Sequence, residues 1–132
     1  MSEIAVVLDT SALLSYADGH VAVGELISEI AAERRLVGVP AACLTAAGAH
    51  VHDKFGTAQL TRLIDIDTVC VLPLTVDDAL EAAQYARAEA GDIAIGQAVL
   101  VALQHEAYYA TAAPKQASSV LPAGWVVIDL SA

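Results

Sequence analysis

Short apolar runs alternate along this chain with longer segments in which apolar and polar residues mix. The runs are only four or five residues long and have few charged side chains, which is typical of strands buried on both faces of a parallel sheet. They cover residues 4–8, 36–39, 69–72, 107–111 and 125–129. Because strands alternate with helical segments, the pattern predicts an α/β domain of three α/β/α layers around a central parallel sheet.

The segments between these runs carry apolar residues at helical spacing. One helix is predicted through Val21, Val23, Leu26, Ile27 and Ile30, with its glutamates on the wetter side. Thr75 and Asp78 have the spacing of a capping box for a helix carrying Leu80, Ala83 and Ala86. The remaining predicted helices cover about residues 11–17, 40–52, 58–64 and 91–105.

Length, composition and cysteine content set broad limits on the kind of protein. The 132 residues predict a single domain, and no apolar run approaches the roughly 18–20 residues needed to cross a bilayer. Acidic Glu3 precedes the first apolar run where a signal peptide would carry basic residues. Cys43 and Cys70 both lie in apolar surroundings and are expected to be reduced, buried thiols. We therefore expect a cytoplasmic protein without a membrane segment.

The charge balance gives no support to strong nucleic-acid binding. Sixteen acidic residues against six basic ones leave a net charge of −10. The basic residues are scattered, and only Arg34 and Arg35 adjoin, whereas phosphate binding needs clustered Lys and Arg. The composition is 57% hydrophobic, more than one small core requires, which favours an additional apolar interface.

The first apolar run ends on Asp9-Thr10-Ser11, where a helix is predicted to begin. A carboxylate at the carboxyl end of a buried parallel strand is well placed to bind a metal ion, but it can equally be a helix N-cap. The segment resembles the opening of the PIN-domain family, which includes the VapC-type toxin ribonucleases. Val39-Pro40 followed by a helix, and the segment from Gly91-Asp92 to His105 and Thr111, match two further family signatures. The resemblance covers nearly the whole chain and implies a single PIN-like domain over residues 1–132.

The resemblance also implies four acidic residues that converge on divalent metal, Mg²⁺ or Mn²⁺. Asp9 matches the first of them, but the other three positions hold Ala46, Ile95 and Ala113. Two-metal hydrolysis of a phosphodiester needs anionic oxygens to hold the ions, and aliphatic side chains cannot supply them. The expectation is therefore a degenerate active site with no cofactor, or weak metal binding at Asp9.

Other polar residues near these segments have two readings. Asp92 is either the N-cap of its helix or a residual, displaced ligand, since it matches the accessory acid of some relatives. Thr10, Ser11 and Thr111 are either neighbours of the site or ordinary cap and strand residues. His50 and His52 stand two residues apart on a predicted helix and so point to different faces, which disfavours a zinc site.

Three functions remain open from the sequence. The first is an inactive VapC-like domain that acts by binding a protein, either an antitoxin-like chain or a second copy in a homodimer. The second is a Mg²⁺- or Mn²⁺-dependent ribonuclease, the toxin of a type II toxin-antitoxin system, reorganised around Asp9 and Asp92; RNA is a partner only in this case. The third is a small-molecule-binding domain that uses the pocket at the carboxyl ends of the strands from which the acids are missing.

Overall fold

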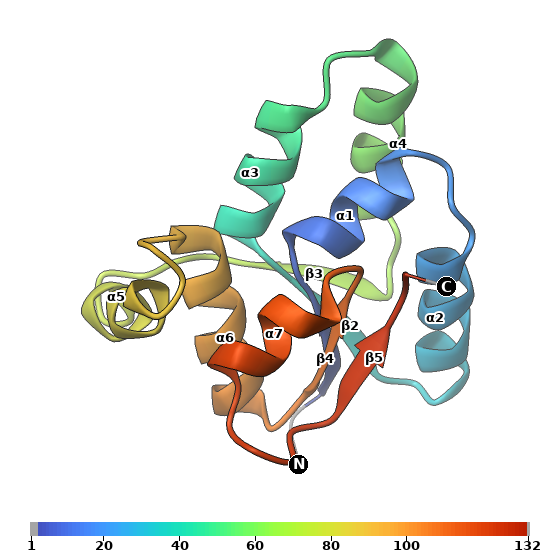
Figure 1. The fold of residues 1–132 in the computed structure, drawn as a ribbon. Helices are drawn as coiled ribbons and strands as arrows, with labels where there is room; N and C mark the ends of the chain where they lie inside the picture. The colour runs from blue at the N-terminus through green and yellow to red at the C-terminus, as the bar shows by residue number, and fades with distance from the viewer. Residues whose placement is uncertain (1–2, 132) are drawn as a thin grey trace.

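Five parallel strands form the centre of the computed structural model, which describes residues 3–131 (Figure 1). They are β1 (Ile4–Leu8), β2 (Leu36–Pro40), β3 (Val69–Leu72), β4 (Tyr108–Thr111) and β5 (Val127–Asp129), in the spatial order β3-β2-β1-β4-β5. Helices cover both faces, so the predicted three-layer α/β/α architecture is confirmed. The chain leaves β1 toward β2 and β3 on one side and later returns to β4 and β5 on the other, which places a topological switch point beside β1.

The central strand is the most deeply buried element. All five residues of β1 are buried, and β1 pairs with β2 on one side and β4 on the other. The apolar run of residues 4–8 therefore behaves as a strand covered on both faces should. The edge strand β3 is more exposed, and Cys70 on it is only half-buried, so the expectation of two buried thiols holds for Cys43 alone.

The helices follow the chain order α1 to α7. The helices that precede β3 in the sequence are α1 (Thr10–Ala17), α2 (Ala22–Ala32), α3 (Ala41–His50) and α4 (Lys54–Ile64). The later helices are α5 (Ala79–Arg87), α6 (Ile93–His105) and α7 (Pro114–Val120). Figure 1 shows the sheet between α2 on one side and α5 with α6 on the other, with α1, α3 and α4 toward the carboxyl ends of the strands.

Four expectations from the sequence need correction. Val21 caps α2 and is 70% exposed, whereas the other apolar residues predicted for that helix face are buried. The helix α4 begins at Lys54, not Ala58, because the Asp53 side chain accepts a hydrogen bond from Gly56 N. The predicted capping box is also wrong: α5 begins only at Ala79, and Leu80 is 82% exposed. The last strand is shorter than predicted.

The helix α7 was not predicted from the sequence. It has seven residues, of which Ala117 alone is buried, so it carries no apolar stripe that a periodicity search would detect. The available signal was Pro114 at its first turn, a favoured position for proline. No helix within residues 3–131 combines the length and apolar character that crossing a membrane requires.

Candidate functional site

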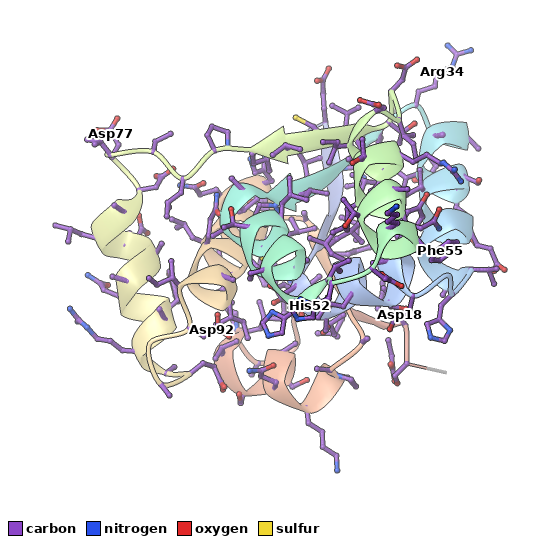
Figure 2. The ribbon with its side chains drawn as sticks, turned by 90° about the horizontal axis from the view of Figure 1, so that it is seen from above. Asp18, Arg34, His52, Phe55, Asp77 and Asp92 are labelled. Carbon is purple, nitrogen blue, oxygen red and sulfur yellow. The ribbon has the colours of Figure 1, made fainter. Side chains whose placement is uncertain are left out.

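A small polar recess lies at the carboxyl end of β1, where α1 and α6 begin. Its volume is about 30 Å³, enough for one water-sized group. Figure 2 looks onto this edge from above and labels Asp92 where α6 begins. The lining comes from α1, α6 and α7, with the caps of the first two: Asp9, Thr10, Ser11, Asp92, Ile95 and Gln116.

Asp9 is held at the recess by its own helix. It is only 5% exposed, and its Oδ1 accepts hydrogen bonds from Ala12 N at 3.0 Å and Ser11 Oγ at 2.7 Å. Asp9 thus caps α1, and Asp92 caps α6 in the same way, accepting from Ile95 N at 3.1 Å. The local reading of both residues as N-caps is confirmed. Each carboxylate still has a second oxygen, and both side chains line the recess.

A chain of hydroxyls joins β4 to this cap; we call Asp9, Ser11 and Thr111 the hydroxyl network. The Ser11 hydroxyl donates to Asp9, so the 3.0 Å bond between Ser11 Oγ and Thr111 Oγ1 takes its proton from Thr111. Backbone N–H groups of Ala112 and Ala113 donate to Ser11 Oγ and Thr111 Oγ1, each at 2.9 Å. The network fixes where the chain turns from β4 into α7.

Two buried groups lie beneath Asp9. Burial raises the pKa of the Cys43 thiol to about 12, and this thiol donates to Ala94 O at 3.2 Å. Burial, followed by the nearby charge of Asp9, also raises the pKa of Tyr109, so its hydroxyl stays neutral. Of the buried side-chain polar atoms in residues 3–131, the Tyr109 hydroxyl is the one without a partner at hydrogen-bonding geometry. Both groups are therefore neutral at physiological pH.

The three positions at which the resemblance implies acids do not all line the recess. Ile95 lines the recess beside Asp9 and Asp92. Ala46 instead lines an adjoining groove between α3, the β3–α5 connection and the start of α6, and Asp92 borders both spaces. Ala113 lies at the start of α7, where its backbone N–H binds Thr111. The structure thus brings Asp9, Thr10, Ser11, Asp92 and Ile95 around one recess.

Two side chains that shape this edge were not singled out from the sequence. Gln97 is 1% exposed; its Oε1 accepts from Ala42 N at 2.8 Å and its Nε2 donates to Leu72 O at 2.9 Å, an arrangement we call the inner bridge. Gln116 reaches the recess from α7. A glutamine within the apolar helix pattern of residues 93–103 was the available signal for the inner bridge, because a buried amide needs partners.

The residues at the recess do not form the ligand set of a two-metal nuclease. Two carboxylates line it, each already capping a helix, and within residues 3–131 no group of three or more Asp, Glu, His or Cys side chains could hold a metal ion. The ring of His50 instead forms a hydrogen bond with Ala46 O in its own helix. A hard divalent ion here would depend on water for most of its ligands.

Comparisons of the sequence with protein-family models and with curated proteins gave no match.

Proposed function

We propose that this chain is a PIN-like domain, similar to VapC-type toxin ribonucleases, whose nuclease site has degenerated and which acts by binding a protein. The observation that carries the proposal is the chemistry of the recess: Ile95 lines it together with Asp9 and Asp92, at a position where the resemblance implies a further acid. Ala46 and Ala113, the other two expected acid positions, add no charge. Two carboxylates that cap helices are a poor basis for phosphodiester hydrolysis.

The exposed apolar side chains support the protein-binding part of the proposal. Val76 is 92% exposed, Leu80 82% and Ile93 64%, all on the segments around α5 and the start of α6. Large apolar side chains that are exposed to solvent, such as Val76 and Leu80 beside the start of α5, often mark an interface. The partner is either an antitoxin-like protein or a second copy of this chain, in a reducing cytoplasm that suits two free thiols.

The interface is tested by sedimentation and by capture. We expect a homodimer, or a specific partner retained from native lysate by tagged protein. Leu80→Glu with Ile93→Glu should abolish either interaction, whereas Val21→Glu, at a comparably exposed apolar position before α2, should leave it intact. A monomer at all concentrations that captures nothing specific would refute the protein-binding proposal.

The loss of activity is tested separately. Purified protein with Mg²⁺ or Mn²⁺ should cleave RNA no faster than buffer, and Asp9→Ala should change nothing. Restoring the acids together, as Ala46→Glu, Ile95→Asp and Ala113→Asp, should recover metal binding measured by calorimetry, while each single change should do little because a metal site needs several ligands at once.

A metal-dependent ribonuclease is the second candidate. The observation in its favour is that Asp9 and Asp92 line the same recess although they lie far apart in the sequence. Cleavage of RNA that disappears in both Asp9→Asn and Asp92→Asn would establish this candidate and refute the inactive one.

A further inference from the structure

The helix α7 forms one wall of the recess, and few contacts hold it there. Gln116 of α7 lines the recess together with Asp9 and Asp92. Of the seven described residues of α7, Ala117 alone is buried, and no side chain in residues 3–131 caps its N-terminus. In contrast, α6 has nine buried residues. Because a short helix with few buried apolar contacts has low local stability, α7 should move more easily than the α6 wall.

Both ends of the segment that carries α7 are fixed. At its start, the Ala112 and Ala113 N–H groups donate to hydroxyls of the hydroxyl network. Beyond its end, after a turn in which Gly124 has a positive φ, the indole Nε1 of Trp125 donates to Ala107 O at 2.9 Å. The helix between these two points can therefore move while β4 and β5 stay paired.

One carboxylate joins the exposed side of α7 to the turn between α5 and α6. The Ser119 hydroxyl donates to Glu89 Oε1 at 2.7 Å, and Gln116 Nε2 donates to Glu89 Oε2 at 3.2 Å. The backbone C=O of Glu89 also accepts a hydrogen bond from Asp92 N at 3.0 Å. Figure 2 shows α7 beside the start of α6, where Asp92 is labelled. Glu89 thus connects the Asp92 side of the recess with the wall that α7 supplies.

The two side-chain bonds of Glu89 can break at a small cost. The Ser119 hydroxyl also lies 2.7 Å from Gln116 O in its own helix, so its proton is shared between that carbonyl and Glu89. The bond from the Gln116 amide to Glu89 is exposed, and water replaces it when it breaks. These contacts therefore hold α7 in place but can be released.

We propose that α7 is a lid over the recess and that Glu89, through its bonds to Gln116 and Ser119, is the latch that keeps it closed. With the lid closed, the recess has a volume of about 30 Å³ and admits one water-sized group to Asp9 and Asp92. With the lid open, larger solutes reach the same two carboxylates. This inference goes beyond the proposed function and needs neither a protein partner nor a metal ion.

Amide hydrogen exchange, measured by NMR, tests the latch. Ala117 N and Leu121 N donate to carbonyls of the α7 segment and report its opening. Glu89→Ala should raise their exchange rates at least about threefold, because it removes hydrogen bonds to a charged group. The amides of Val7 in β1 and Val99 in α6 should change less. Unchanged rates in α7, or an equal rise in the core, would overturn the latch.

Matched variants separate the latch from a general loss of charge. Glu29→Ala removes an exposed acid from α2 and should leave exchange in α7 unchanged; an effect equal to that of Glu89→Ala would refute the latch. Glu89→Gln keeps an acceptor oxygen, so its rates should lie between those of wild type and Glu89→Ala. This variant also provides the test if Glu89→Ala does not fold.

A double-mutant cycle tests the contact itself. Ser119→Ala should accelerate exchange in α7 in the wild-type background but have a smaller effect beside Glu89→Ala, in which the partner carboxylate is already absent. Fully additive effects would show that the two side chains act independently and would overturn the assignment of Glu89.

Thiol labelling tests whether α7 covers the recess. Ile95→Cys places a thiol in the recess wall, and Cys70→Ser removes the half-buried thiol of β3. Iodoacetamide is larger than the one group that about 30 Å³ admits, so alkylation requires the lid to open. Adding Glu89→Ala should raise the labelling rate at least about threefold. The Cys70→Ser protein alone gives the background from buried Cys43. Equal rates with and without Glu89 would show that α7 is not a lid.

Discussion

Two polar clusters hold the carboxyl edge of the sheet together, and they differ in their access to water. The inner bridge is a single amide, 1% exposed, that joins α6 to the start of α3 and the end of β3. The hydroxyl network joins β1, α1 and β4 beside the open recess. Ser11 lines the recess, where water can replace a lost partner, whereas the Gln97 side chain does not reach the surface, so deletions of the two side chains should have different costs.

The close contact between α5 and α6 at Gly96, the residue before Gln97, should be the most sensitive to an added methyl group. A Cβ added at Gly96 would lie 2.4 Å from Ala82 O and 2.9 Å from Ala86 Cβ, so Gly96→Ala would push α5 away from α6. We expect a loss of about 3 kcal/mol in the free energy of unfolding, measured by urea denaturation. A loss below about 0.5 kcal/mol would show that α5 shifts freely.

Removing the amide of the inner bridge should have the next largest effect. Gln97→Met keeps the volume but leaves Ala42 N–H and Leu72 C=O without their side-chain partner. The expected loss is about 2 kcal/mol, and hydrogen exchange at Ala42 should accelerate. A neutral result would mean that water reaches this position after all, which would remove the contrast between the clusters.

Alkaline pH tests the burial of the Cys43 thiol, next to Ala42 of the inner bridge in the sequence, without changing the inner bridge itself. Burial raises the pKa of Cys43 from the ordinary thiol value of 9.0 to about 12, so at alkaline pH the folded state retains the thiol proton that the unfolded state loses. The stability contribution is complete below pH 9 and is lost progressively as pH rises toward 12. Between pH 8 and pH 10 wild-type protein should lose about 1.4 kcal/mol more than Cys43→Ala. Parallel curves for the two proteins would contradict this.

The hydroxyl network should tolerate a deletion better. Ser11→Ala removes the contacts of Ser11 Oγ with Asp9, Thr111 and Ala112, which outnumber the two bonds of Gln97. Because water can enter from the recess, the expected loss is only about 1 kcal/mol. A loss equal to or larger than that of Gln97→Met would show that the number of bonds, not burial, decides the cost.

The smallest expected effect is a gain. Gly48 lies within α3, and an added Cβ there would meet nothing within 4 Å. Gly48→Ala, the same chemical change as at Gly96, should stabilise the protein by about 0.5–1 kcal/mol through helix propensity. Thermal denaturation of both variants gives the comparison, and destabilisation at Gly48 would indicate that this face of α3 is covered in solution.

Local sequence rules were sufficient for the sheet and for the two caps. The run of residues 4–8 predicted β1 because five consecutive apolar residues have few alternatives to a strand buried on both faces. Asp9 and Asp92 were recognisable as caps because a cap bonds an N–H only three residues away. These interactions depend on neighbours in the chain, so the order of residues determines them.

Tertiary structure alone decided how the edge of the sheet is assembled. Gln97 bonds Ala42 and Leu72, which are 55 and 25 residues away, and no local pattern specifies those partners. Gln116 reaches the recess on a helix too short to be seen as a periodic pattern, and Tyr109 faces Asp9 only because β4 returns beside β1. Such contacts follow from strand order and helix packing, which depend on burying apolar side chains from distant parts of the chain in one core.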